Sequence, residues 1–146
     1  METYTTRNPE ETLELGKKIG LGLKKGDVVC VFGELGSGKT CLIKGIASGL
    51  GISEREYVRS PTFTILLTYR GSPPLHHFDF YRLSDTGEIE ELGLSEYFLG
   101  EGVCAVEWPE RLGPLLPENR IDIFIEEVSE SERKISISLP VAATPR

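Results

Sequence analysis

The sequence has few cysteines and a deficit of positive charge. Its three cysteines, Cys30, Cys41 and Cys104, have the spacing of neither a disulfide framework nor a metal site, which favours a reducing compartment. Sixteen Lys and Arg residues stand against 23 Asp and Glu residues, and the net charge is −7. Because nucleic acids attract cationic surfaces, we expect no binding to DNA and contact with RNA only through a partner.

Long apolar runs are also missing. No run approaches the roughly 20 residues that a membrane-spanning helix needs. The opening residues METYTTRNPEE contain no apolar segment typical of an export signal. These two absences predict a cytoplasmic protein without membrane contact.

The composition is that of an ordinary globular protein, with 39% apolar and 27% charged residues in a chain of 146. That length suits one domain with a core of its own. We predict a single domain over residues 1–140 and a frayed tail over 141–146.

The first predicted helix has clear signals at both ends. Asn8, followed by Pro9 and two glutamates, predicts the start. Two lysines and a glycine at residues 24–26 predict the end. Gly16 and Gly20 lie on one stripe of this helix and would let another backbone approach closely.

Apolar runs and alternating residues predict a mixed sheet, with an irregular loop from Pro109 to Pro117. The predicted strands are Val28–Phe32, Thr62–Tyr69, Leu75–Phe80, Val103–Val106, Ile121–Glu126 and Ile135–Leu139. The later predicted helices are Lys39–Leu50, one beginning at Asp85, and Ser95–Leu99. The fold class is therefore α/β: a P-loop NTPase-like three-layer fold, with a mixed sheet and antiparallel hairpin additions.

The turn after the first of these strands has the P-loop pattern Gly33-x-x-x-x-Gly38-Lys39-Thr40. Glycines let successive backbone N–H groups curl around a phosphate, and the helix that follows adds the positive end of its dipole. In this pattern the lysine neutralises phosphate oxygens and the Thr40 hydroxyl binds Mg²⁺. The backbone N–H of Cys41, one residue further into the helix, would reach the α-phosphate.

The nucleotide is inferred by exclusion. A GTPase would carry an Asn-Lys-x-Asp signature and an Asp-x-x-Gly switch, and the sequence contains neither. We therefore expect ATP with Mg²⁺.

Hydrolysis needs a second metal ligand beside Thr40 and a group that orients water. A P-loop protein usually carries an acid at the end of a second buried strand, and Glu107 ends the apolar run VCAVE, although a surface carboxylate at a strand end has the same pattern. Trp108, the single tryptophan, either packs in the core or covers the nucleotide pocket.

Two further stretches carry polar groups in unusual settings. In SPTFTI, Thr62 follows a proline and either meets Mg²⁺ or the γ-phosphate or simply begins a strand. In LHHFDFYRL, Asp79 lies among aromatic residues, where a carboxylate is costly unless it is paired. It orients water or metal, or it forms a salt bridge with Arg82. His76 and His77 are adjacent, so on a strand they face opposite ways, and we expect no metal site from this pair.

Together the runs GELGSGKT, SPTFT, HFDFYRL, EELGLSEYF and VEWPERLG, in this order and spacing, resemble the TsaE family, also called YjeE. The resemblance extends from about Asn8 to about Leu139. It implies a bacterial ATPase that works with TsaB and TsaD in forming threonylcarbamoyladenosine beside the tRNA anticodon. TsaC supplies the activated threonylcarbamoyl group, TsaD transfers it, and ATP hydrolysis resets the TsaB–TsaD complex.

The resemblance also implies roles for individual residues. Asp79 and Thr62 would lie near the γ-phosphate, and Thr40 and Glu107 would hold Mg²⁺. The residues expected to contact the nucleotide are Gly33, Glu34, Leu35, Gly36, Ser37, Gly38, Lys39, Thr40, Cys41, Trp108, Glu110 and Arg133. Cys41 departs from the threonine usual at its position. A thiol at a helix start can have a lowered pKa, but we expect a small packing residue.

Two other functions stay open at the level of sequence. A small P-loop kinase would need a lid with several arginines, and only Arg111 and Arg120 stand near a plausible lid. A scaffold that binds nucleotide without hydrolysing it would carry the same phosphate-binding turn.

Overall fold

A computed structural model describes residues 1–53, 65–82 and 93–139. Within these residues, seven strands form one mixed sheet in the order β1-β7-β6-β2-β5-β4-β3. The strands are β1 (Glu2–Thr6), β2 (Val28–Phe32), β3 (Leu66–Tyr69), β4 (Leu75–Asp79), β5 (Val103–Glu107), β6 (Ile121–Glu127) and β7 (Arg133–Ser138). The helices are α1 (Pro9–Leu21), α2 (Lys39–Gly49) and α4 (Leu94–Phe98).

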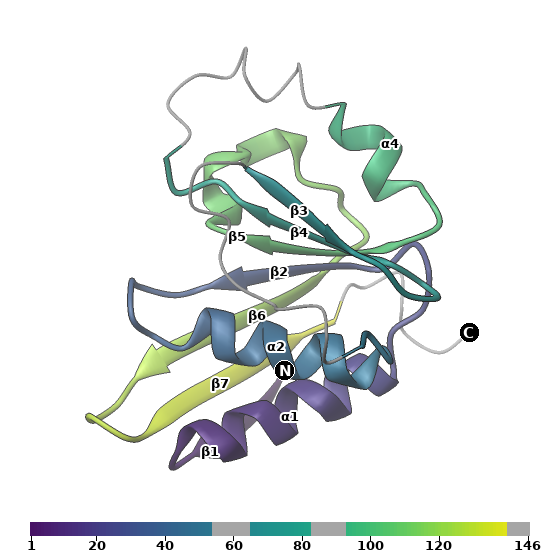
Figure 1. Cartoon of the computed structure of the whole chain (residues 1–146). Coiled ribbons are helices and arrows are strands. Elements are labelled where there is room, and N and C mark those ends of the chain that lie inside the picture. The colour runs from purple at the N-terminus through teal and green to yellow at the C-terminus, as the bar shows by residue number, and fades with distance from the viewer. Residues whose placement is uncertain (54–64, 83–92, 140–146) are drawn as a thin grey trace.

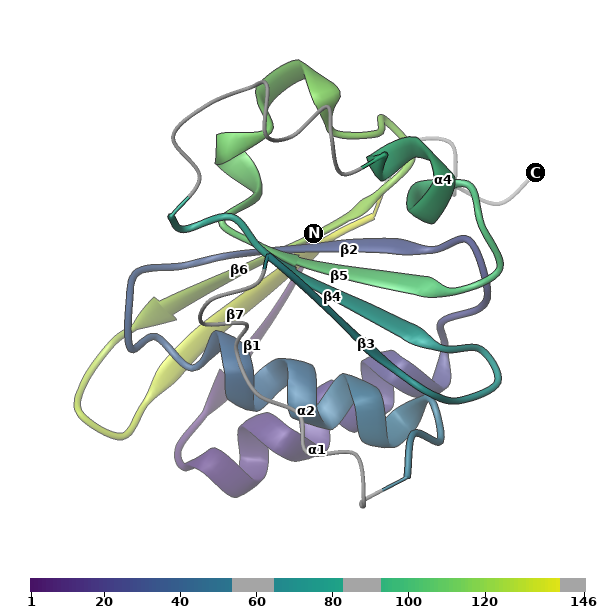
Figure 2. The ribbon, with the colours of Figure 1, turned by 45° about the horizontal axis from the view of Figure 1, so that its top comes forward.

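The sheet has a parallel centre and antiparallel edges. β4, β5, β2 and β6 run parallel to one another, while β3 and β7 add to the two sides as antiparallel hairpin partners, and β1 pairs antiparallel with β7. α1 and α2 cover one face and α4 lies on the other (Figures 1 and 2). The expected three-layer α/β fold with hairpin additions is confirmed.

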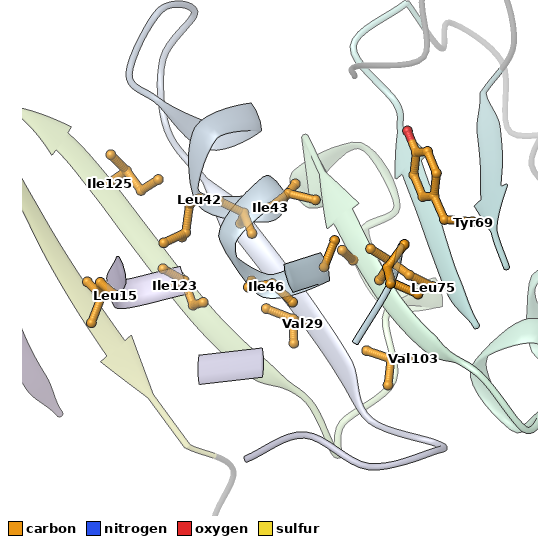
Figure 3. Packing of buried hydrophobic residues seen from close by; sticks show 14 of the residues in the cluster. Leu15, Val29, Leu42, Ile43, Ile46, Tyr69, Leu75, Val103, Ile123 and Ile125 are labelled. Carbon is orange, nitrogen blue, oxygen red and sulfur yellow. The ribbon is translucent and has the colours of Figure 1, made fainter. Parts of the chain in front are cut away.

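The larger core cluster lies between the sheet and α2. Ile43 and Ile46 are fully buried in the same cluster as Val29 of β2, and Figure 3 shows Ile46 beside Val29. Val29 lies on a strand whose first four residues are buried on both faces, as its continuous apolar run predicts. The other face buries a second cluster that includes Phe78, Phe80 and Phe98.

Glycines set the distance between α1 and α2, as the sequence predicts. A Cβ atom placed on Gly16 would lie 2.4 Å from the carbonyl oxygen of Leu42 and 2.9 Å from the Cα atom of Gly45. One turn further on, a Cβ atom placed on Gly20 would lie 3.0 Å from the Cα atom of Gly49. The two helix backbones therefore touch directly.

The start of α1 is as predicted, but its end is not. The Asn8 side chain accepts a hydrogen bond from the N–H of Glu11 over 2.8 Å, and Pro9 is the first helical residue. The helix stops at Leu21, not at residues 24–26. Gly20 and Gly22 weaken the helical preference there, and residues 24–27 form a separate turn in which the N–H of Asp27 donates to the Lys24 carbonyl.

Other differences are small. β1 has no counterpart among the predicted strands, and the expected irregular loop after Glu107 contains two 3₁₀ turns, Pro109–Arg111 and Gly113–Leu115. The expected helix at Asp85, the first residues of the strand predicted from Thr62 and the predicted tail at 141–146 lie outside the described residues. None of the helices in the described ranges is long and apolar enough to cross a membrane.

Candidate nucleotide-binding site

The glycine-rich turn joins the carboxyl end of β2 to the start of α2 (Figure 1). Gly36 and Gly38 have φ angles of 78° and 105°, a region that side chains other than glycine disfavour. Gly38 is the N-cap of α2 and has no side chain to cap the first N–H groups. The positive end of the helix therefore faces outward from the turn, as an anion site requires.

A pocket of about 380 Å³ opens beside this turn. It is lined by Leu35, Gly36, Gly38, Lys39, Thr40, Cys41, Asp79, Tyr81, Glu107 and Trp108. Nine of these ten residues are expected site residues, and they come from α2, β4, β5 and the turns that follow β2, β4 and β5. The fold thus brings together segments that lie up to 73 positions apart in the sequence.

A larger groove of about 720 Å³ lies between β1 and α1, away from the phosphate turn. Its floor is apolar, with Leu15, Ile19 and Ile137, and its rim carries carboxylates such as Glu10 and Glu14. The glycine-rich turn and Lys39 line the smaller pocket and not this groove, so the smaller pocket beside α2 is the candidate nucleotide site.

Lys39 is folded back onto the turn. Its side-chain Nζ donates hydrogen bonds to the carbonyl oxygens of Gly33 and Glu34, and it lies 4.4 Å from the ring centroid of Trp108. Burial lowers the pKa of the Lys39 ammonium, and the charges of Glu107 and other nearby carboxylates oppose that shift. The turn therefore carries a buried cation whose Nζ is bound to two backbone carbonyl oxygens.

Asp79 and Glu107 lie side by side at the carboxyl ends of two parallel strands. They are register partners between β4 and β5, and Val31 of β2 is the register partner of Glu107 on its other side. Burial raises the pKa of the Asp79 carboxyl, while the N–H of Tyr81, which donates to its Oδ1 over 2.9 Å, lowers it. Two carboxylates therefore meet the start of α2 at one wall of the pocket.

The sequence leaves open a salt bridge from Asp79 to Arg82 and a position of Glu107 on the surface, and the structure supports neither. Within the described residues, Asp79 forms no salt bridge with Arg82, which is exposed. Glu107 is not a surface acid: only 3% of the residue is exposed.

His77 is a residue that the sequence analysis did not assign to the site. It is fully buried, and its Nε2 lies 2.6 Å from Oε2 of Glu107. His76 points to the other face and hydrogen-bonds with the Thr68 hydroxyl, so the expected opposite orientation of the two histidines is confirmed. The register partner of His77 is Ala105, two residues before Glu107 on the neighbouring strand. Only this register, which the sequence does not show, reveals that His77 and Glu107 are neighbours.

Trp108 packs against the apolar core and also covers Lys39 in the phosphate turn. Its ring lies over the Lys39 ammonium and 4.9 Å from the ring of Tyr81, and the residue also packs against the apolar cluster of the α4 face. Its φ of 56° is the one positive φ of a non-glycine residue among the described residues. This conformation turns the indole back over the phosphate turn at the end of β5.

Arg133 contacts the turn rather than the pocket. Its Nε donates to the carbonyl oxygen of Ser37 over 2.9 Å, and its Nη1 donates to carbonyls of the β6–β7 turn, those of Ser129, Glu130 and Glu132. Glu110 is exposed and outside the pocket lining, although its charge raises the pKa of Lys39. Thr62 lies outside the described residues.

Cys41 does not have the activated thiol that a helix start can produce. Burial raises the pKa of its thiol, and its Sγ donates to the carbonyl oxygen of Pro9 over 3.4 Å. Arg120 is one of the two arginines near the lid that a kinase would need. Its side chain is bound to Asp122 over 2.9 Å and to the Pro117 carbonyl, which weakens the case for a kinase.

Within the described residues, no group of three or more Asp, Glu, His or Cys side chains is placed to hold a metal ion alone. A P-loop magnesium site does not need one, because phosphate and water oxygens supply most of its ligands. The oxygens of Thr40 and Glu107 are the hard ligands that Mg²⁺ prefers, so these residues fit the ion.

A parallel central sheet, a glycine-rich turn running into a buried lysine, and acidic residues at the end of the neighbouring strand define an α/β protein of the P-loop NTPase-like class. The family model described as threonylcarbamoyl adenosine biosynthesis protein TsaE matches residues 6–135. The chain belongs to the TsaE family, as the sequence resemblance indicates.

Individual relatives agree over most of their length. The tRNA threonylcarbamoyladenosine biosynthesis protein TsaE of Bacillus subtilis is 46% identical over 136 residues, which cover 92% of this chain and 84% of that protein. The protein of the same name from Treponema pallidum is 39% identical and covers 91% and 97% of the two chains. The crystal structure of Bacillus subtilis YdiB superposes with a TM-score of 0.81 at 40% identity, over 94% of this chain and 84% of that one.

Proposed function

We propose that the protein binds and hydrolyses Mg·ATP as the ATPase component of the pathway that forms threonylcarbamoyladenosine in tRNA. The pathway is the one that the names of the family model and of the relatives carry. The observation that supports ATP chemistry best is the meeting of Lys39, Asp79 and Glu107 at the mouth of one glycine-rich turn. An anion bound without a metal ion would leave the buried Glu107 and the half-buried Asp79 beside it without a purpose.

The residues divide the work as follows. Backbone N–H groups of residues 34–41 and the Lys39 ammonium bind the phosphates, with Lys39 exchanging its carbonyl partners for phosphate oxygens. Thr40 and Glu107 hold the magnesium ion, which when bound neutralises charge on the phosphate oxygens. Asp79, whose raised pKa follows from its burial, orients the attacking water at the pocket wall. Thr62 is proposed to complete the γ-phosphate side.

The proposed partner is the TsaB–TsaD complex, which ATP hydrolysis would reset between turnovers, with TsaC acting upstream. The net charge of −7 supports contact with tRNA only through these proteins. The three free cysteines support action in the reducing cytoplasm.

Phosphate release with and without TsaB–TsaD tests the proposal. We expect stimulated release by the native protein and none by Lys39→Ala, which removes the cation of the turn. Lys25→Ala is the matched control, because Lys25 is an exposed lysine paired with Glu101 far from the pocket, and it should behave as the native chain.

The same assay separates the alternatives. Appearance of a phosphorylated small molecule in place of inorganic phosphate would establish the kinase. Unchanged turnover in Glu107→Ala, with ATP still bound, would remove Glu107 from the mechanism and point to a scaffold or to another acid.

A further inference from the structure

The pair formed by His77 and Glu107 is the most deeply buried polar contact beside the pocket. His77 is fully buried and Glu107 is 3% exposed, and 2.6 Å separate Nε2 of the ring from Oε2 of the carboxylate. Glu107 lines the pocket and His77 does not. Whatever His77 does for the site, it does through Glu107.

The hydrogen-bond network assigns the tautomer of the ring. A carboxylate accepts, so Nε2–H donates to Glu107. Nδ1 is buried and has no hydrogen-bond partner in the described structure. An unpaired ring nitrogen is less costly as a lone pair than as a buried N–H, so the unpartnered Nδ1 favours the tautomer that carries its proton on Nε2.

The strands fix the position of this donor. The register partner of His77 is Ala105, two residues before Glu107, so both side chains project from the same face of the sheet, toward α2. Every residue of β4 is buried or half-buried, and the strand lies between β3 and β5 in the sheet. The imidazole therefore stands on a rigid support behind the carboxylate.

We propose that His77 is a positioning residue for the magnesium site: its Nε2–H restrains the Glu107 carboxylate in the orientation that it has at the pocket wall. The inference rests on the proposed binding of Mg·ATP. A carboxylate held by an outer partner loses less freedom when it meets a cation, and removing such partners typically costs 10–100-fold in metal affinity.

A pair of substitutions separates this role from simple filling of the core. In His77→Gln the amide nitrogen reaches approximately the place of Nε2 and can donate to Glu107. In His77→Asn it stops near the place of Nδ1 and cannot. Both variants bury one neutral amide, so a purely structural role predicts similar losses from the two.

The measurement is the affinity for a non-hydrolysable ATP analogue by calorimetry, once with Mg²⁺ and once with EDTA. We expect the gain in affinity on adding Mg²⁺ to fall about 10–100-fold in His77→Asn and to stay within a few-fold of native in His77→Gln. The affinity in EDTA should be unchanged in both, since His77 does not line the pocket.

The outcomes distinguish failure of this inference from failure of the proposed function. No magnesium-dependent gain in the native protein overturns the proposed function and the inference with it. A native gain that His77→Asn retains, or that both variants lose equally, overturns the inference alone.

Nitrogen-15 NMR of the native protein keeps the inference open to refutation should either variant fail to fold. We expect the Nε2–H tautomer of His77 and a shift of its resonance when the analogue is added with Mg²⁺, but not with EDTA. The inference is overturned if the ring is protonated on Nδ1 alone. It is also overturned if the His77 resonance does not shift when the analogue is added with Mg²⁺.

Discussion

The side chain of Arg133 donates a hydrogen bond from Nε to the backbone carbonyl oxygen of Ser37, over 2.9 Å in space and 96 positions in sequence. The rest of its guanidinium is taken up by carbonyls of the β6–β7 turn and by Glu127, 3.7 Å from Nη2. The arginine therefore ties the last hairpin of the sheet to the glycine-rich turn, and its planar fork is what allows contacts in several directions at once.

We predict that Arg133→Lys loosens the turn as much as Arg133→Ala does, because lysine keeps the charge but not the fork. Hydrogen bonds from a charged donor contribute about 1.5–3 kcal/mol, so nucleotide affinity should fall about 10–100-fold in both variants. Hydrogen exchange should accelerate at the amides of residues 34–40. Lys134→Ala, at the exposed neighbouring position, is the control. Native affinity in Arg133→Lys alone would instead mean that Arg133 acts by its charge on the nucleotide.

The contact between the backbones of α1 and α2 leads to a prediction about stability. In Gly16→Ala the new methyl group would meet the carbonyl oxygen of Leu42 at 2.4 Å, a backbone atom that cannot rotate away. Overpacking of this kind costs about 1–3 kcal/mol, which urea denaturation would measure as a lower midpoint.

Gly22→Ala is the matched control for that substitution. Gly22 ends the same helix with a φ of −92°, and its added Cβ would meet the nearest atom at an ordinary 3.6 Å. Its stability should stay within about 0.5 kcal/mol of native. Equal losses in the two variants would show that the packing of α1 against α2 is not the cause.

The three thiols should differ sharply in reactivity. Burial raises the pKa of Cys30 and of Cys104 to about 12, so neither reacts in the folded protein. Cys41 is only partly buried, but burial also raises its thiol pKa above the ordinary 9.0. A thiol reagent should therefore modify one cysteine, more slowly at pH 8 than it modifies a free thiol, with a rate that keeps rising above pH 9. Cys41→Ser should abolish the reaction, and a fast reaction at pH 7 would contradict the raised pKa.

The central part of the fold could be predicted because its signals are local. The continuous apolar run of β2, the glycine turn and the apolar periodicity of α2 follow one another along the chain, and each is recognisable without its neighbours. β1 carries no such signal. Four of its five residues are exposed, and it is a strand because β7 offers it a partner, with Glu2 opposite Ile137. Propensity cannot foresee a pairing across 135 positions.

The same distinction holds for the site. Lys39 and Glu107 could be found from the sequence because Lys39 follows a buried strand at the P-loop spacing and Glu107 ends another. The support of Glu107 by His77 and of the turn by Arg133 depends on which strands are neighbours and in which register. The sequence does not indicate the first, and the expected contact of Arg133 with the nucleotide stays a prediction beside its observed contact with the turn. Spacing identifies groups that face a ligand more readily than groups that hold them in place.

The position of β1 has a practical consequence for anyone preparing this protein. Thr6, the last residue of β1, is the register partner of Arg133, and its hydroxyl lies 2.8 Å from that of Thr12 in α1. Routine trimming of the first six residues, often done to remove an exposed leader before crystallisation, would strip a neighbour from the arginine that steadies the glycine-rich turn.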